Sequence, residues 1–130
     1  MASGRILVVD DDDQLRDLLR ARLRQAGYDV ELAADSVEAI RTILNGVPDL
    51  LVCDINLPYM NGLDLVRALR GDEATRYLPV IFLTAREDRE SWVEAVRIGV
   101  SDYLFKPVSV DQLSLSIHRA LTEPARQIVG

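Results

Sequence analysis

Residues 5–13 have the sequence RILVVDDDD, in which an aliphatic run leads directly into four aspartates. A short, mostly β-branched run bounded by polar residues is typical of a buried β-strand. The segment that follows, 13–26, has leucines at 15, 18, 19 and 23, which lie on one face of a helix. A buried strand followed by an amphipathic helix predicts the first unit of an α/β fold.

The same pattern occurs five times along the chain. The expected strands are 5–9, 29–33, 49–53, 80–83 and 102–105, and the expected helices are 13–26, 37–45, 62–70, about 88–98 and 110–121. Strands that alternate with helices through short connections favour a parallel sheet covered on both faces. Five units predict a flavodoxin-like three-layer (βα)5 fold with strand order 2-1-3-4-5, rather than the six-stranded dinucleotide-binding fold.

Length and composition indicate one globular domain, because 48% of the 130 residues are hydrophobic and 28% are charged. We expect this domain over residues 1–121, with 122–130 as a C-terminal tail or the start of a linker. The apolar runs are at most four residues long, far short of the ~20 that a bilayer span needs. No signal-like segment opens the chain, so a cytoplasmic protein is expected.

The scarce residue types exclude further classes. The single cysteine, Cys53, cannot form an internal disulfide or a zinc cluster, and we expect it to be an inert core thiol. The single histidine, His118, is expected to be exposed and without a catalytic role. The net charge of −6 disfavours direct binding to nucleic acid.

Four of the expected strands end at polar residues. Asp10 and Asp11 follow the first strand, Asp54 the third, Thr84 the fourth and Lys106 the fifth. In this strand order ligands sit at the carboxyl ends of the strands, where the first and third are neighbours. Three carboxylates brought together there repel one another unless a cation neutralises them. Oxygen ligands with room for water favour Mg²⁺, so the sequence predicts a magnesium site.

The same strand ends predict phosphoryl chemistry. The Lys106 ammonium and the Thr84 hydroxyl complete a pocket for an anion bound to the metal. A phosphoryl group attached to Asp54 meets these demands, with Asp54 as the nucleophile and Lys106 stabilising the developing charge. Each residue alone also has an ordinary structural explanation, so the prediction rests on their joint placement. Asp12 and Asp13 are expected only to be solvated at a helix start.

Five short motifs resemble those of one family: ILVVDD at 6–11, CDINLP at 53–58, MNG at 60–62, LTA at 83–85 and YLFKP at 103–107. By these motifs the chain resembles a response-regulator receiver domain of bacterial two-component signalling, from about Arg5 to Leu121. Asn61 stands where the family often has Asp, and it has no catalytic role there.

The resemblance implies roles for individual residues. Asp54 would accept a phosphoryl group from the phosphohistidine of a sensor histidine kinase or a phosphotransfer protein. Asp10, Asp11 and the main-chain carbonyl of Asn56 would bind Mg²⁺ together with Asp54. Thr84 and Lys106 would contact the phosphoryl group. The peptide bond between Lys106 and Pro107 is usually cis in the family, and cis bonds are essentially confined to proline.

The resemblance also implies a switch, in which Thr84 moves toward the phosphate and Tyr103 swings inward behind it. Strand alternation places Tyr103 and Phe105 on one side of the fifth strand, and helical spacing places Trp92 and Val96 together. The resulting apolar cluster, on the face of the fourth helix, fifth strand and fifth helix, is either ordinary core or an output surface. An effector domain, an output partner or a second copy of the chain is the expected occupant.

Two residues are expected at the mouth of the pocket because of their spacing. Asn56 lies two residues after Asp54, and Arg86 lies two residues after Thr84. In the family the matching positions influence phosphoryl lifetime. Asn56 can orient a water, and the Arg86 guanidinium can lie over phosphoryl oxygens or simply be solvated.

Two other functional classes share parts of this pattern. A haloacid-dehalogenase-type phosphatase would need a second acid at the position of Asn56 and a substrate cap, for which the chain is too short. A flavodoxin-like FMN binder would need a phosphate loop after the first strand, where four aspartates would repel a phosphate. The absorbance of the purified protein would show whether it binds FMN and so tests the second alternative. A degenerate, unphosphorylated receiver is disfavoured because all five site residues are present.

Overall fold

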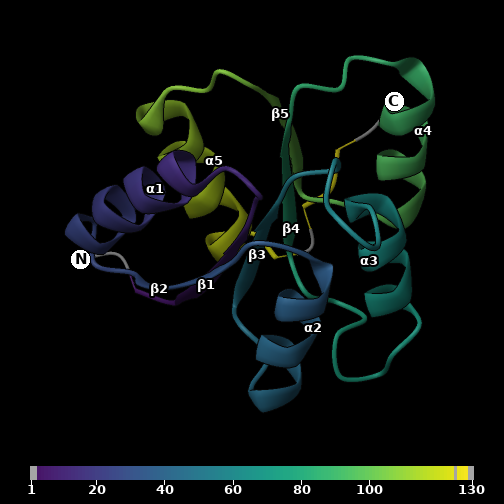
Figure 1. Cartoon of the computed structure of the whole chain (residues 1–130), viewed down its shortest axis with the longest axis horizontal. Helices are drawn as coiled ribbons and strands as arrows, with labels where there is room; N and C mark the ends of the chain where they lie inside the picture. The colour runs from purple at the N-terminus through teal and green to yellow at the C-terminus, as the bar shows by residue number, and fades with distance from the viewer. Residues whose placement is uncertain (1–2, 125, 129–130) are drawn as a thin grey trace.

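A computed structural model describes residues 3–124 and 126–128 and shows five strands alternating with five helices (Figure 1). In chain order they are β1 (Arg5–Val9), α1 (Asp13–Gln25), β2 (Asp29–Ala33), α2 (Ser36–Asn45), β3 (Leu50–Cys53), α3 (Gly62–Arg70), β4 (Val80–Thr84), α4 (Arg89–Ile98), β5 (Asp102–Phe105) and α5 (Val110–Thr122). The boundaries differ from the expected ones by one residue at several ends. The most relevant shift is at β4, which includes Thr84.

The strands form one parallel sheet in the order β2-β1-β3-β4-β5, which confirms the flavodoxin-like fold. β2 is an edge strand, and polar and apolar residues alternate along most of it, whereas β3 is central and wholly apolar. In the register of the inner pair, Val9 lies opposite Cys53. The residues that follow them, Asp10 and Asp54, therefore leave the sheet side by side.

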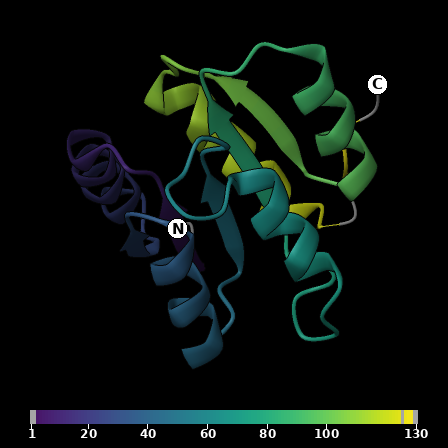
Figure 2. The ribbon, with the colours of Figure 1, turned by 45° about the vertical axis from the view of Figure 1, so that its right-hand side comes forward.

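Helices cover both faces of this sheet (Figures 1 and 2), and a hydrophobic core lies between the sheet and each helical layer. Residues of β1 alternate between the two cores, because Leu7 and Val9 face one side while Ile6 and Val8 face the other. α1 and α5 cover the Ile6 side, and α2, α3 and α4 cover the Leu7 side. Burying each large aliphatic side chain stabilises the fold by about 1.5–3 kcal/mol, so this alternation fixes the register of the strand.

Every helix begins at a side chain that accepts a hydrogen bond from its first turn, namely Asp12, Asp35, Asn61, Asp88 and Ser109. Such N-caps satisfy amide groups that would otherwise lack partners. At α2 the cap is reciprocal, with the Glu38 amide donating to Asp35 over 2.8 Å. The Glu38 carboxylate in turn accepts from the amide of Ala34. Helix starts are thus set locally, and they lie next to the strand ends.

Candidate functional site

Three carboxylates meet at the carboxyl ends of β1 and β3. Asp10, Asp11 and Asp54 each offer an oxygen, and these oxygens lie within 4.8 Å of one another. Asp10 and Asp54 are buried, whereas Asp11 is exposed and opens the cluster to solvent. An all-oxygen donor set with one open side suits a hard divalent cation that keeps part of its water shell.

Lys106 reaches into this cluster from the end of β5. Its Nζ lies 2.7 Å from an oxygen of Asp10 and 2.9 Å from an oxygen of Asp54. Burial raises the pKa of Asp10, and the hydrogen bond from Lys106 opposes that rise only in part. Burial lowers the pKa of Lys106, but its hydrogen bonds to both carboxylates outweigh this, and the pKa ends above its usual value. This ammonium pairs with two carboxylates of a cluster of three, so the cluster keeps an excess of negative charge.

Backbone groups hold the two buried acids in place. The amide of Asp12 donates to Asp10 over 2.9 Å, and the amide of Asn56 donates to Asp54 over 3.2 Å. The peptide bond between Lys106 and Pro107 is cis, as the family resemblance implies. The amide of Lys106 donates to the carbonyl of Thr84 over 2.9 Å, so the end of β5 is tied to the end of β4.

Arg16, on the first turns of α1, is a site neighbour that sequence reasoning missed. Its Nη1 donates to the carbonyl of Asp10 over 2.6 Å, and the side chain is 14% exposed. It also pairs with Asp13, which the sequence assigned only to solvent. The one signal in the sequence was its position four residues after the helix cap Asp12. That spacing faces Arg16 back toward the strand end.

Gly62, the last residue of the MNG motif at 60–62, is a second neighbour whose role the sequence did not reveal. A Cβ on Gly62 would lie 2.2 Å from the carbonyl oxygen of Asp54 and 2.9 Å from Cα of Ile55. The amide of Gly62 donates to the carbonyl of Ile55 over 2.7 Å. The first turn of α3 therefore packs directly on the backbone of Asp54, and only glycine allows this approach.

Thr84 and Tyr103 both contact the backbone of Arg86. Thr84 is fully buried, and its Oγ1 accepts from the Arg86 amide over 3.1 Å. The Tyr103 hydroxyl donates to the Arg86 carbonyl over 2.9 Å. The Tyr103 ring is buried among Phe82, Trp92 and Phe105, and its centre lies 5.4 to 6.1 Å from the centre of each of these rings. Tyr103 thus joins the loop after β4 to the aromatic residues of α4 and β5.

The Arg86 side chain points toward the start of α4. Its Nη1 lies 3.4 Å from the hydroxyl of Ser91, and its Nε lies 3.8 Å from Asp88. To cover a group on Asp54, the guanidinium would have to leave these partners. Asn56, the other residue expected at the pocket mouth, is exposed beside the acid cluster.

The residues expected on the output face have different exposures. Trp92 and Val96 on α4 are half-buried, and Phe105 at the end of β5 is 45% exposed. Leu115 of α5 and Val93 of α4 are also exposed. The described part of α4, β5 and α5 therefore presents apolar groups to solvent.

Two residues lie where the sequence placed them without a role. Cys53 is fully buried, and burial raises the pKa of its thiol well above the ordinary range. This agrees with an inert core thiol. His118 is exposed on α5.

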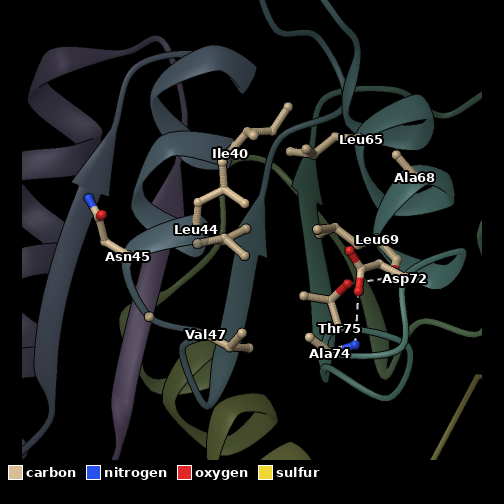
Figure 3. A pocket seen from close by; sticks show the side chains of 12 residues that line it. Ile40, Leu44, Asn45, Val47, Leu65, Ala68, Leu69, Asp72, Ala74 and Thr75 are labelled. Carbon is tan, nitrogen blue, oxygen red and sulfur yellow. Dashed lines mark hydrogen bonds between the residues drawn. The ribbon is translucent and has the colours of Figure 1, made fainter.

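A separate apolar pocket of about 400 Å³ lies between α2 and α3 (Figure 3). Leu44 and Val47 on one side face Leu65 and Leu69 on the other, and none of the predicted site residues lines it. Its one carboxylate, Asp72, accepts from the amide of Ala74 and so completes a local turn. This pocket therefore lacks the residues from which the sequence predicts phosphoryl chemistry.

No described helix combines the length and the apolar composition that crossing a membrane requires. The chain is thus a parallel α/β domain in which a cluster of three carboxylates and one lysine lies at the carboxyl ends of the strands. Residues 6–118 match the family described as "Response regulator receiver domain". The chain belongs to this family.

Relatives and solved structures agree with this assignment. Response regulator MprA of Mycobacterium sp. (strain KMS) is 45% identical over 119 residues, and MprA of Mycobacterium ulcerans is 46% identical over 121 residues. The matches cover 90% and 92% of this chain and 50% of each relative. The chain thus spans about half the length of the curated relatives it matches.

Among solved structures, a putative response regulator of Chloroflexus aurantiacus matches with a TM-score of 0.87 and 35% identity, covering 94% of this chain and all of that one. A CheY-like response regulator receiver domain protein of Methanospirillum hungatei matches with a TM-score of 0.88 and 32% identity, covering 95% and 97%.

Proposed function

We propose that Asp54 accepts a phosphoryl group from the phosphohistidine of a histidine kinase or phosphotransfer protein, in a reaction that depends on Mg²⁺. The observation that carries this proposal is the convergence of Asp10, Asp11 and Asp54 with Lys106 at adjacent strand ends. A carboxylate oxygen of Asp54 would form the new bond to phosphorus while the bond from phosphorus to the histidine nitrogen breaks. The electron pair leaves with the imidazole, and no outside oxidant or base is needed.

The residues present fit a bound Mg²⁺, because three carboxylates converge and, among the described residues, Lys106 is the one cation whose ammonium pairs with them. Asp10, Asp11, Asp54 and the carbonyl of Asn56 would hold the ion, which would neutralise charge on the transferred group when bound. Lys106 would stay beside the phosphoryl oxygens as a fixed ammonium. Thr84 would exchange its contact with the Arg86 amide for a hydrogen bond to the product.

The test is phosphorylation by a small donor. With acetyl phosphate and Mg²⁺, mass spectrometry should find one hydroxylamine-labile phosphoryl group on Asp54. Asp54→Asn should stay unmodified, because an amide is not a nucleophile of this kind. Asp72→Asn, which removes an exposed carboxylate elsewhere, is the matched control and should be modified like the parent. Modification of His118 or of a serine, or full modification of Asp54→Asn, would refute the proposal.

The metal requirement has its own test. Mg²⁺ should raise the melting temperature of the parent by binding the folded state. Asp11→Ala should lose most of this rise, while Asp17→Ala, which changes an exposed aspartate further along α1, should keep it. A parent whose melting temperature does not respond to Mg²⁺ would contradict the metal site.

We further propose that phosphorylation rearranges Thr84 and Tyr103 and so changes the output face around Trp92, Val96 and Phe105. The support is the chain of contacts from Thr84 through the Arg86 backbone to the Tyr103 hydroxyl, and from the Tyr103 ring to Trp92. Beryllofluoride, a phosphoryl mimic, should change the emission of Trp92. Tyr103→Ala should blunt this change while phosphorylation continues, and an unchanged parent spectrum would contradict the switch.

The lifetime of the phosphoryl group is proposed to depend on Asn56 and Arg86. Because Arg86 now contacts Ser91 and Asp88, any shielding would follow a movement of its side chain after phosphorylation. Arg86→Ala should then speed dephosphorylation several-fold, and an unchanged or longer lifetime would exclude shielding.

The proposed partners are a sensor kinase or phosphotransfer protein at the acid cluster and an effector, or a second copy of the chain, on the output face. These exchanges would occur in the cytoplasm. Direct binding of nucleic acid by this acidic domain is not expected, given its net charge of −6.

A further inference from the structure

A second pocket, of about 370 Å³, lies at the opposite end of the sheet from the acid cluster, next to the starts of β4 and β5. Four arginines line it: Arg70 at the end of α3, Arg76 before β4, Arg97 at the end of α4 and Arg126 in the C-terminal segment. The described residues that line it include no aspartate or glutamate, although the whole chain has 21 of them and a net charge of −6. An arginine pocket on an acidic protein calls for a specific physical explanation.

Ion pairs account for only two of these four charges. Arg97 pairs with Glu94 over 2.8 Å, and Arg126 pairs with Glu123 over 3.5 Å. Within the described residues, no carboxylate lies within 4 Å of Arg70 or Arg76. The pocket therefore has a formal excess of two positive charges.

Arg70 shows that one of these charges is held in a fixed position. Its side chain is half-buried, and it donates from Nε to the carbonyl of Ile98 over 2.9 Å and from Nη2 to that of Gly99 over 3.0 Å. A longer contact of 3.4 Å joins Nη1 to the carbonyl of Thr75. These neutral acceptors orient the guanidinium without cancelling its charge. They occupy three of its five donors and leave two for a ligand.

The remaining lining residues suit a small organic molecule. Tyr77, which is 84% exposed, presents an aromatic ring at the rim, and Leu78, Pro79 and Ile98 add apolar surface. The C-terminal segment forms one wall, and it is tied down by the amide of Ile128, which donates to the carbonyl of Val100 over 3.1 Å. The volume lies within the usual range for ligand pockets, about 300–1,000 Å³.

We infer that this pocket binds a phosphate monoester of a small molecule that has an apolar or aromatic body. Near neutral pH a phosphate monoester carries a charge of about −1.5 to −2, which matches the charge of the two unpaired guanidinium groups. A ligand with one carboxylate would neutralise only half of the excess positive charge in the pocket. Guanidinium also matches phosphate geometry in a bidentate manner. The inference does not use Asp54 or Mg²⁺, so it stands apart from the proposed phosphorylation.

The test is an NMR titration of the ¹⁵N-labelled chain with phenyl phosphate, in EDTA so that the acid cluster holds no Mg²⁺. Saturable amide shifts should centre on residues 76–79 and 97–101, with a Kd of about 1 mM or below. Benzoate should bind more weakly, because it carries one charge. Shifts that centre on Asp10, Asp54 and Thr84, or that do not saturate, would overturn the inference.

Two variants make the test specific. Arg76→Gln should weaken phenyl phosphate about tenfold or more, since it removes one charged hydrogen-bonding group from an exposed position. Arg41→Gln removes an exposed arginine from α2 and is the matched control, expected within about twofold of the parent. Equal losses in both variants would show diffuse attraction and overturn the pocket. Saturable binding of a hexaglutamate peptide without binding of phenyl phosphate would also overturn it, in favour of a protein partner.

Discussion

The two ends of the sheet have opposite electrostatic character. At the carboxyl ends of the strands, Asp10, Asp11 and Asp54 cluster and the Lys106 ammonium pairs with two of them, whereas at the other end Arg70 and Arg76 have no described carboxylate partner. Both ends bury part of their charge, and both hold it with backbone hydrogen bonds. Net charge therefore conceals what a domain can bind. An excess of either sign, fixed in a pocket, indicates a ligand of the other sign.

α3 connects these two ends, because Gly62 begins it against Asp54 and Arg70 ends it against α4. Gly62→Ala should have the largest effect on stability, at least about 3 kcal/mol lost from the free energy of unfolding, measured by urea denaturation. The reason is that the new Cβ would lie 2.2 Å from the carbonyl oxygen of Asp54. The backbone would have to move to relieve this clash.

Gly71→Ala is the control at the other end of the same helix. There a Cβ would meet no atom closer than the carbonyl oxygen of Ala68, at 3.5 Å. The substitution should change stability by no more than about 1 kcal/mol, in the favourable direction. Similar losses from both substitutions would mean that α3 is sensitive along its whole length, and the comparison would fail.

Lys106→Met tests the acidic end directly. Without Mg²⁺ at pH 7, removing the ammonium leaves Asp10 and Asp54 unpaired, and we expect a loss of about 2–3 kcal/mol in urea denaturation. Added Mg²⁺ should recover more stability in this variant than in the parent, because the ion replaces the missing charge. Arg20→Met breaks an exposed pair with Asp17 and should cost no more than about 0.5 kcal/mol. An Mg²⁺ response equal to that of the parent would contradict this account.

Arg70→Gln tests the arginine end, with an expected loss of about 1–2 kcal/mol. Its guanidinium caps the last carbonyls of α4, but burial lowers its pKa, so its desolvation offsets part of the gain. Arg24→Gln, which removes an exposed arginine from the last turn of α1, should cost only about 0.3 kcal/mol. A gain in stability of Arg70→Gln would mean that desolvation exceeds the capping contribution.

The smallest effect on stability is expected from Asp88→Asn, at the opposite end of α4, where Asp88 caps the helix. A hydrogen bond from the Ser91 hydroxyl is the main reason that the pKa of Asp88 is lowered from 3.8. Its contribution to stability is therefore full above pH 3.8 and is lost as the pH falls through the lower pKa of the folded state. Asp88→Asn retains a cap without this titration. The parent should lose more stability than the variant on acidification, and parallel pH profiles would exclude the effect.

Much of the fold follows from sequence because the strands and helices have distinct periodicities, and because Asp10, Asp54, Thr84 and Lys106 stand directly at the expected strand ends. Their convergence then follows from strand order alone. The contacts of Arg16, Gly62 and Arg70 do not, because they depend on how closely and at what angle helices pack on the sheet. The direction of the Arg86 side chain depends on the cap of α4, a neighbour that the strand-end pattern does not include.

Cys53 precedes the proposed acceptor by one residue and lies at the centre of the sheet, with a thiol that is fully buried and hard to ionise. A thiol-directed reagent can therefore reach it only when the strands separate. The rate of labelling therefore measures how often β3 opens. No engineered probe is needed, because Cys53 is the one cysteine in the sequence. Labelling rates measured with and without Mg²⁺ or a phosphoryl mimic would show how much each ligand slows the opening of β3.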